Sequence, residues 1–264
     1  MVFYGWVILG AAMLMDLCTA PAHSTGLNIF FDDLMTATNT PRASMSLTYS
    51  IALCTSAALT PLVGWLVDIL GPRQVAVVAV AITGAALIGL AGVTGQLELG
   101  VWFAMLRFGG PECMSICGTT AVMRWFVKRR GLVSSIRTVG GMVVYMFPAL
   151  IGPTLDRLGW RGTFRMLGLV TFVVGGAAAL LIKTSPEEEG VLPDGEMPPP
   201  GKPLRDSEAN GDDDAGAARA TADLQVGEPD FTFEEVARQR FLWYYMTCSM
   251  AYDLFWAGGW TQCH

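Results

Sequence analysis

The stretch that decides the fold is Gly64-Trp-Leu-Val-Asp-Ile-Leu-Gly-Pro-Arg73, a decapeptide with one charge at Asp68 and another at Arg73. Its first residues close a run, residues 43–67, that has no charged side chain for 25 residues, and residues 74–97 after it have none for 24. About 20 apolar residues cross a bilayer as a helix. The decapeptide therefore predicts a charged turn, about five residues long, that joins two membrane-spanning helices.

Similar apolar runs recur along residues 1–183, and the composition agrees with them. The chain is 52% hydrophobic and 15% charged, which leaves too little polar surface to cover a soluble globule of 264 residues. We predict an all-α integral membrane protein whose residues 1–183 form a six-helix transmembrane bundle. The predicted spans are residues 3–31, with a kink at Pro21, and residues 43–67, 74–97, 99–123, 131–155 and 166–182. Residues 32–42 and 156–165 are predicted as polar connections.

The formal net charge of -6 pools two unlike regions of the chain. Residues 184–238 carry 15 acidic and 4 basic side chains and include a Pro-Pro-Pro run at 198–200. Such a segment buries too little apolar surface to offset its ordering entropy, so we predict a cytoplasmic, acidic, disordered linker. Residues 239–264 are predicted to begin a seventh transmembrane helix. A C-terminal six-helix half is expected in the full-length protein.

Positive charge predicts the orientation of the bundle. The loop after the fourth predicted span contains Arg124, Lys128, Arg129 and Arg130 and no acidic residue. Short loops rich in Lys and Arg stay on the cytoplasmic side. We therefore expect a multi-pass protein of the cell membrane with its N-terminus and linker in the cytoplasm, and contact of this loop with anionic lipids as a second role.

Part of the decapeptide is repeated 88 residues further along the chain, in a segment that we call the echo loop. Asp156-Arg-Leu-Gly159-Trp-Arg161 repeats the pattern Asp-x-Leu-Gly-x-Arg of Asp68 to Arg73. The first copy connects the second and third predicted spans, and the second connects the fifth and sixth. Because three helices separate equivalent turns, the copies should face opposite sides of the membrane. This predicts an inverted repeat of three helices plus three, an arrangement that secondary transporters use.

Several motifs resemble one transporter family. The spacing of Gly64, Asp68, Gly71 and Arg73 resembles the signature loop of the major facilitator superfamily. Its monocarboxylate and oxalate/formate antiporter branch is similar in further stretches, which are Tyr4-Gly-Trp-Val7, Trp125-Phe-Val-Lys-Arg-Arg-Gly-Leu132, Gly140-Gly141, Pro148, Gly159-Trp-Arg161 and residues 186–194. Ile69, Pro72 and Pro111 depart from the family pattern. The resemblance covers the N-terminal half of a major-facilitator fold and part of helix seven, and it implies that the decapeptide is a gating loop. In the alternative interpretation Asp68 and Arg73 belong to a solvated turn.

Four ionisable side chains inside predicted spans are candidate site residues. An ionisable group in a helix bundle is expensive and is a functional hypothesis by default. Arg107 is the leading candidate to bind a substrate carboxylate, with Arg137 as a second candidate, because guanidinium pairs with carboxylate in a bidentate way. Asp16 and Glu112 are candidates to couple a proton or to pair with a charge; in the alternative interpretation, one of them simply neutralises Arg107 between helices. His23 is predicted as a polar pore-lining or interfacial group rather than a proton relay.

The sequence contains none of the motifs that would indicate an enzyme. There is no pairing of nucleophile and base, no metal-ligand set and no phosphate-binding loop, and Cys113 and Cys117 fit as small apolar side chains. We therefore expect no catalytic residue, no metal, no cofactor and no nucleic-acid partner.

The predicted function is secondary active transport of a small organic anion, a monocarboxylate or dicarboxylate, by alternating access. A co-transported proton is left open as a second partner, beside the lipid bilayer. The alternative is a truncated, non-transporting membrane protein or interaction partner derived from such a transporter.

Overall fold

The computed structural model describes residues 3–183, 244, 247 and 248 of the 264 residues. The chain divides into two compact units, residues 1–204 and 205–264. In the second unit the three described residues are exposed and helical, and the Thr247 hydroxyl donates a hydrogen bond to the Tyr244 carbonyl at 3.0 Å. The predicted acidic linker lies outside the described residues. So does the predicted seventh helix, apart from these three residues.

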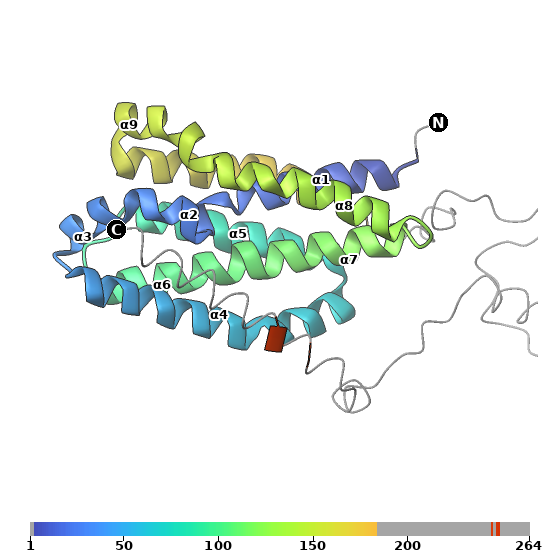
Figure 1. Cartoon of the computed structure of the whole chain (residues 1–264), viewed down its shortest axis with the longest axis horizontal. Coiled ribbons are helices and arrows are strands. Elements are labelled where there is room, and N and C mark those ends of the chain that lie inside the picture. The colour runs from blue at the N-terminus through green and yellow to red at the C-terminus, as the bar shows by residue number, and fades with distance from the viewer. Residues whose placement is uncertain (1–2, 184–243, 245–246, 249–264) are drawn as a thin grey trace, which may run out of the picture. The chain divides into compact units, whose positions relative to one another are not determined.

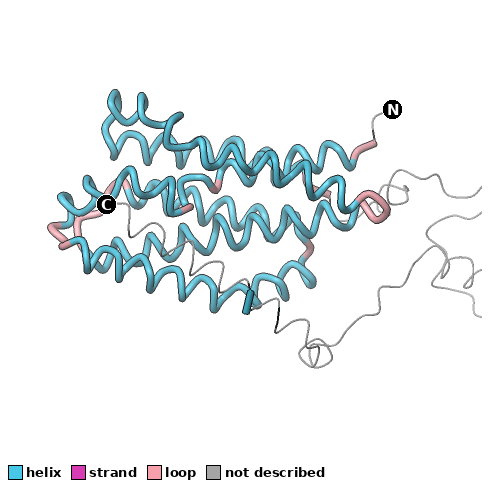
Figure 2. The backbone as a smooth tube through the Cα atoms, viewed as in Figure 1, coloured by secondary structure: helices cyan, strands magenta, loops and turns pink. Residues whose placement is uncertain are grey.

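Helices account for all the regular structure of residues 3–183, and Figure 2 shows them packed side by side with short connections. The all-α prediction is confirmed for this part of the chain. The α-helices are α1 Gly5–Cys18, α2 Ser24–Leu27, α3 Phe31–Thr38, α4 Arg42–Leu70, α5 Pro72–Leu90, α6 Gln96–Arg107, α7 Ser115–Trp125, α8 Arg130–Gly141, α9 Phe147–Val170 and α10 Gly176–Leu181. Short 3-10 segments are η1 Ala20–Ala22, η2 Asn28–Phe30 and η4 Met142–Met146, and π-helical segments are η3 Phe108–Met114 and η5 Thr171–Gly175.

Four helical stretches in the described residues are long and apolar enough to cross a membrane. They are Gly5–Ala22, Arg42–Leu70, Pro72–Leu90 and Arg130–Leu181. The last has 52 residues, more than twice the roughly 20 that one crossing needs. The predicted span 99–123 is divided among α6, η3 and α7, each shorter than one crossing. The division of the bundle into six spans stays a prediction.

The first predicted helix is broken where proline predicts it. α1 ends at Cys18, Pro21 lies in η1, and His23 is extended with ψ 151° before α2 begins. The predicted polar loop 32–42 is wrong over its first part, because α3 occupies Phe31–Thr38. Leu34 is fully buried there, and the two aspartates in the first turn complement the positive end of the helix dipole.

The opening decapeptide makes a tighter turn than predicted. α4 continues to Leu70 and α5 begins at Pro72, so the turn is Gly71 alone, with φ 83° and ψ 155°. Only glycine adopts this conformation without strain, and proline suits the first position of the next helix. Hence the predicted five-residue turn is wrong in length, while the hairpin of two long helices is present.

Gly159 has nearly the same backbone conformation as Gly71, with φ 66° and ψ 170°. It is the one non-helical residue inside α9, so the predicted connection 156–165 is helical on both sides of a single break. Figure 1 shows this break and the α4–α5 turn at opposite ends of the bundle. The shared conformation at equivalent glycines supports the internal repeat, and its inversion across a membrane stays a prediction.

Packing inside the bundle relies on aromatic rings and small residues. One apolar cluster gathers around Trp125 and Phe126, and a second contains Phe30 and Phe164, whose ring centroids lie 4.4 Å apart. α5 packs against α9, and a Cβ added at Gly168 would lie 3.0 Å from the carbonyl oxygen of Gly84. Small residues let two membrane helices approach this closely.

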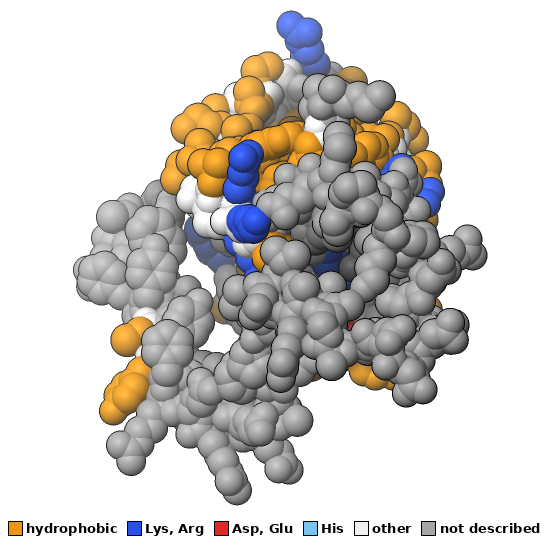
Figure 3. Space-filling view, turned by 90° about the vertical axis from the view of Figure 1, so that its right-hand side faces the viewer, with side chains coloured by type: hydrophobic (Ala, Val, Ile, Leu, Met, Phe, Trp, Pro, Cys, Tyr) orange, Lys and Arg blue, Asp and Glu red, His pale blue; other side chains and the backbone are white. Residues whose placement is uncertain are grey.

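Cationic residues from separate segments lie together at one end of the bundle. The Trp125 indole donates to the Lys183 carbonyl at 3.3 Å, and the Lys183 ammonium lies 4.4 Å from the centre of the Tyr4 ring. Arg124 at the same end lies 4.0 Å from Asp68. Figure 3 looks onto this end and shows Lys and Arg side chains among apolar ones.

Candidate functional site

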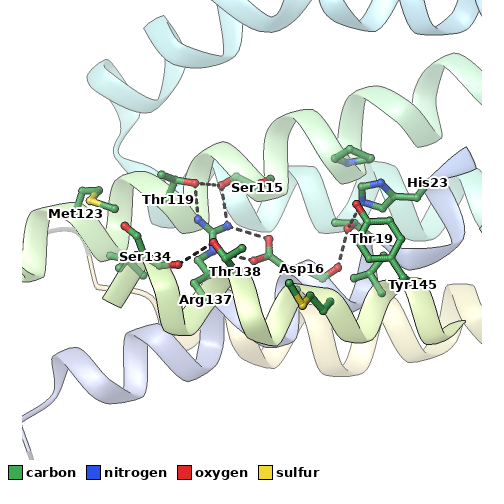
Figure 4. Close-up of a pocket in the computed structure, with 15 residues that line it drawn as sticks. Asp16, Thr19, His23, Ser115, Thr119, Met123, Ser134, Arg137, Thr138 and Tyr145 are labelled. Atoms are coloured by element: carbon green, nitrogen blue, oxygen red, sulfur yellow. Dashed lines mark hydrogen bonds and ion pairs between the residues drawn. The ribbon is translucent and has the colours of Figure 1, made fainter. Parts of the chain in front are cut away.

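A cavity of about 560 Å³ opens beside the middle of the bundle. It lies among α1, the broken turn of helix one, α7, α8 and η4 (Figure 4). Its lining is Asp16, Thr19, His23, Pro111, Ser115, Thr119, Val122, Met123, Ser134, Arg137, Thr138, Gly141, Met142, Val144 and Tyr145. Three of the residues singled out from the sequence, Asp16, His23 and Arg137, therefore share one cavity. This volume is in the usual range for small-molecule sites.

Arg137 and Asp16 form a bidentate ion pair across this cavity. The Arg137 Nε donates to Asp16 Oδ2 at 2.8 Å, and Nη2 donates to Asp16 Oδ1 at 2.9 Å. The side chains are 13% and 17% exposed. Such parallel charge-assisted bonds are the strong class of hydrogen bond. The pair joins α8 to α1, so Arg137 points into the bundle.

α7 holds the other side of the Arg137 guanidinium. Nη2 donates to the Ser115 carbonyl at 3.1 Å and Nη1 donates to the Thr119 hydroxyl. With these contacts Arg137 uses four of the five N–H groups of its guanidinium. The sequence analysis missed Ser115 and Thr119, although their spacing of four residues places both on one helix face.

Arg107 lies outside the cavity lining and has different contacts. Its Nη1 donates to the Ala22 carbonyl at 3.2 Å, and its Nη2 lies 3.6 Å from Glu112 Oε1. The Arg107 side chain is 12% exposed, and its buried Nε has no hydrogen-bond partner. The break at Pro21 turns the Ala22 carbonyl toward this guanidinium. Arg107 thus connects the broken turn of helix one to the C-terminal end of α6.

The pair of Arg107 and Glu112 is made within one helix. The two residues are five positions apart, and η3 is π-helical, a geometry that aligns residues five apart. Glu112 also accepts a hydrogen bond from the Thr60 hydroxyl of α4 at 3.1 Å. Of the two acids predicted as alternatives for neutralising Arg107, Glu112 contacts it, while Asp16 pairs with Arg137.

Thr19 connects the ion pair to His23 along the broken helix. Its hydroxyl donates to the Asp16 carbonyl at 2.6 Å and lies 3.3 Å from the His23 Nε2. Figure 4 shows this chain of polar groups on one wall of the cavity. His23 therefore lines the cavity, the position that the sequence analysis preferred for it.

The loop residues lie at the ends of the bundle. Asp68 is 79% exposed and lies 4.0 Å from Arg124 of α7, and Arg73 is exposed at the start of α5. Exposed pairs of this kind contribute about 0–1 kcal/mol. The structure therefore brings one of the gating-loop candidates, Asp68, near Arg124 of the basic loop, which also contains Lys128, Arg129 and Arg130.

In the echo loop the three candidate residues are exposed. Asp156 and Gly159 lie in α9, and the Arg161 guanidinium lies 4.7 Å from the centre of the Trp160 ring. Within residues 3–183 no three His, Cys, Asp or Glu side chains gather as a metal site.

Long apolar helices around a polar cavity with one bidentate ion pair define a class, the multi-pass helical membrane proteins. The comparisons with known proteins give the family. The profile of the Major Facilitator Superfamily matches residues 6–261, so the chain belongs to this superfamily. The resemblance drawn from its motifs is confirmed, including the monocarboxylate-like branch.

Three relatives illustrate the range of the family. The chain is 29% identical to "Riboflavin transporter RibJ" of Trypanosoma cruzi (strain CL Brener) over 72% of this chain and 41% of the relative. It is 24% identical to "Monocarboxylate transporter 7" of Homo sapiens, covering 67% and 34%, and 27% identical to "Monocarboxylate transporter 6" of Mus musculus, covering 72% and 42%. The chain thus spans about two fifths of the length of the relatives it matches.

Proposed function

We propose that the chain belongs to a secondary active transporter that moves a small organic anion, a monocarboxylate or dicarboxylate, by alternating access. One observation carries the proposal: inside a cavity of about 560 Å³, the Arg137 guanidinium binds the Asp16 carboxylate through two parallel hydrogen bonds. Relatives named monocarboxylate transporters support the same substrate class. The family match disfavours an enzyme and a non-transporting membrane protein.

In the proposed cycle a substrate carboxylate takes the place of Asp16 on Arg137. A proton taken up by Asp16 removes its negative charge and weakens its hold on the guanidinium. The incoming anion then accepts hydrogen bonds from the same two N–H groups of Arg137. The Ser115 carbonyl and the Thr119 hydroxyl keep the guanidinium oriented. Anion and proton would therefore enter the cavity together, with no net charge added.

The two arginines have different roles in this proposal. Arg137 lines the cavity and is the anion-binding residue, whereas Arg107 lies outside the lining and supports the shape of helix one through the Ala22 carbonyl. Glu112, in η3, neutralises Arg107 at the end of α6. The proposal therefore assigns substrate binding to Arg137, whereas the sequence interpretation had Arg107 as the leading candidate.

The loops supply the proposed gate and orientation. Asp68 and Arg73 would hold one access state, with the end that carries Arg124 facing the cytoplasm. The N-terminus and the linker would share that side in the cell membrane, and a second bundle would complete the translocation path around a midplane site.

A second candidate is a neutral substrate with hydrogen-bonding groups. Arg107 and Arg137 each have an acidic partner in the described structure, so neither charge needs a ligand anion. The relative named as a riboflavin transporter agrees with such a substrate.

Uptake into liposomes separates these candidates. Full-length protein is reconstituted, and uptake of labelled lactate, oxalate and riboflavin is measured with and without an inward proton gradient. We expect carboxylate uptake that the gradient stimulates and that Arg137→Ala abolishes, while Arg157→Ala, which removes an exposed arginine of α9, leaves it intact. Carboxylate uptake that survives in the Arg137→Ala protein would contradict the site. Uptake of riboflavin alone would favour the neutral candidate.

A further inference from the structure

Hydroxyl side chains surround the guanidinium of Arg137 in the cavity. α7 contributes Ser115 and Thr119, and α8 contributes Ser134 and Thr138. Within each helix the two residues are four positions apart, so they share one face. Figure 4 shows both pairs close to the ion pair. The cavity therefore has more hydrogen-bonding capacity than one carboxylate needs.

The directions of the hydrogen bonds decide what this wall can bind. The Thr119 hydroxyl donates to the Ser115 carbonyl at 2.7 Å, and the Thr138 hydroxyl donates to the Ser134 carbonyl at 2.9 Å. A hydroxyl has a single hydrogen and two lone pairs. Since that hydrogen is used inside the helix, each threonine presents acceptor lone pairs to the cavity. One lone pair of the Thr119 oxygen accepts the hydrogen bond from Arg137. The side chains of Thr119 and Thr138 are both exposed to the cavity.

The wall of threonines thus accepts hydrogen bonds, and Arg137 supplies donors for a carboxylate. A ligand that matches both must combine a carboxylate with hydroxyl groups. A plain carboxylate of the same length has no hydroxyl hydrogen to donate to the threonine oxygens, so it would not make those bonds. A site built to hydrogen-bond a substrate hydroxyl discriminates strongly against the analogue without it.

We propose that Thr119 and Thr138 make the cavity selective for hydroxylated organic acids, small carboxylates that carry hydroxyl groups on the carbons beside the carboxylate. The carboxylate lies on the Arg137 fork, and the hydroxyl hydrogens of the ligand donate to the two threonine oxygens. This rests on the proposed function, because it specifies which organic anions the same cavity transports. Thr119 and Thr138 are specificity-determining residues in this account, and Arg137 stays the anion-binding residue.

The test compares matched ligands in liposomes that contain the full-length protein. Glycerate and propionate have the same carbon chain and differ in two hydroxyl groups. A net hydrogen bond of ordinary strength is worth about a factor of five, so we expect kcat/KM for glycerate to exceed that for propionate by about tenfold or more. Thr138→Val keeps the shape of the side chain and removes the acceptor, and we expect it to reduce this preference by about fivefold.

Two further variants keep the result interpretable. Thr138→Ser retains the oxygen and should retain the preference, which also covers the case in which the valine variant fails to fold. Thr55→Val is the matched control, because the Thr55 hydroxyl donates to the Ile51 carbonyl at 2.8 Å in the same way but on α4, outside the cavity. It should leave the preference for glycerate unchanged.

Equal kcat/KM for glycerate and propionate in the wild-type protein would overturn the proposal while leaving the proposed anion transport intact. A preference that Thr138→Val does not alter would overturn the assignment to this wall. If the wild-type protein carried the neutral polyol ribitol as well as gluconate, the assignment to anions would be wrong. The proposed function itself would be refuted if the protein took up none of glycerate, propionate, lactate and oxalate.

Discussion

Removing either partner of the Arg137 and Asp16 pair should destabilise the bundle by a predictable amount. The two groups share bonds of 2.8 and 2.9 Å and are 13% and 17% exposed, so either deletion leaves a largely buried charge behind. Breaking a buried pair in this way costs about 3–5 kcal/mol. Because both side chains border a cavity that water can enter, we expect about 3 kcal/mol for Asp16→Ala and for Arg137→Ala.

The double variant separates a coupled pair from two independent residues. Removing both charges should cost little more than removing one, which corresponds to a coupling energy of about 2–3 kcal/mol. Unfolding of the purified full-length protein by SDS in mixed micelles, followed by tryptophan fluorescence, measures each free energy. Additive losses from the two single variants would refute the coupling.

The Arg107 and Glu112 pair provides the matched control for this cycle. Its N···O distance is 3.6 Å, and each side chain has another partner, the Ala22 carbonyl for Arg107 and the Thr60 hydroxyl for Glu112. We expect a coupling below about 1 kcal/mol for this pair. A coupling as large as that of Asp16 with Arg137 would contradict the distinction drawn between the two arginines.

Three further outcomes are expected. Gly159→Ala should lower the melting temperature, because φ 66° with ψ 170° is a conformation open essentially to glycine alone and a Cβ there costs about 1–3 kcal/mol. Gly64→Ala should not lower it, because a Cβ at this position of α4 would meet open space. The pKa of Glu98 lies below its ordinary value, mainly because the Thr94 backbone N–H donates to the carboxylate. The stabilisation from this hydrogen bond is therefore complete above the ordinary Glu pKa and is lost as pH falls through the lowered pKa. Protection of the Thr94 amide from hydrogen exchange should fall only at acid pH. Glu98→Gln should remove this pH dependence. Arg107→Ala should speed amide exchange in the broken turn of helix one, whose carbonyl it holds, while Arg157→Ala should not; unchanged exchange would contradict the supporting role.

Local signals in the sequence predicted the helices well. The charge-free runs beside Asp68 and Arg73 predicted α4 and α5, and Pro21 predicted the break in helix one. The repeated Asp-x-Leu-Gly-x-Arg pattern predicted a connection at Asp156 to Arg161, and the one break in α9 lies within it, at Gly159. Each of these features depends on residues that are neighbours in the chain, so the sequence contains the physical cause.

The partners of the ionisable groups could not be predicted in the same way. Asp16 and Arg137 are 121 positions apart, and whether they meet depends on how α1, α7 and α8 pack. The pairing of Arg107 with Glu112 depends on the π-helical geometry of η3, which displaces the two side chains from α-helical spacing. α3 was missed because the burial of Leu34 against other helices overrides its polar neighbours.

The central claim is that transported anions occupy the cavity beside Arg137. The most direct measurement places a thiol there, as Thr138→Cys, and follows its reaction with a charged, water-soluble methanethiosulfonate in the full-length protein. We predict that saturating glycerate slows this reaction, while a thiol placed at the exposed position 157, outside the cavity, reacts at an unchanged rate. An unprotected thiol at position 138, in protein that transports glycerate, would contradict the account.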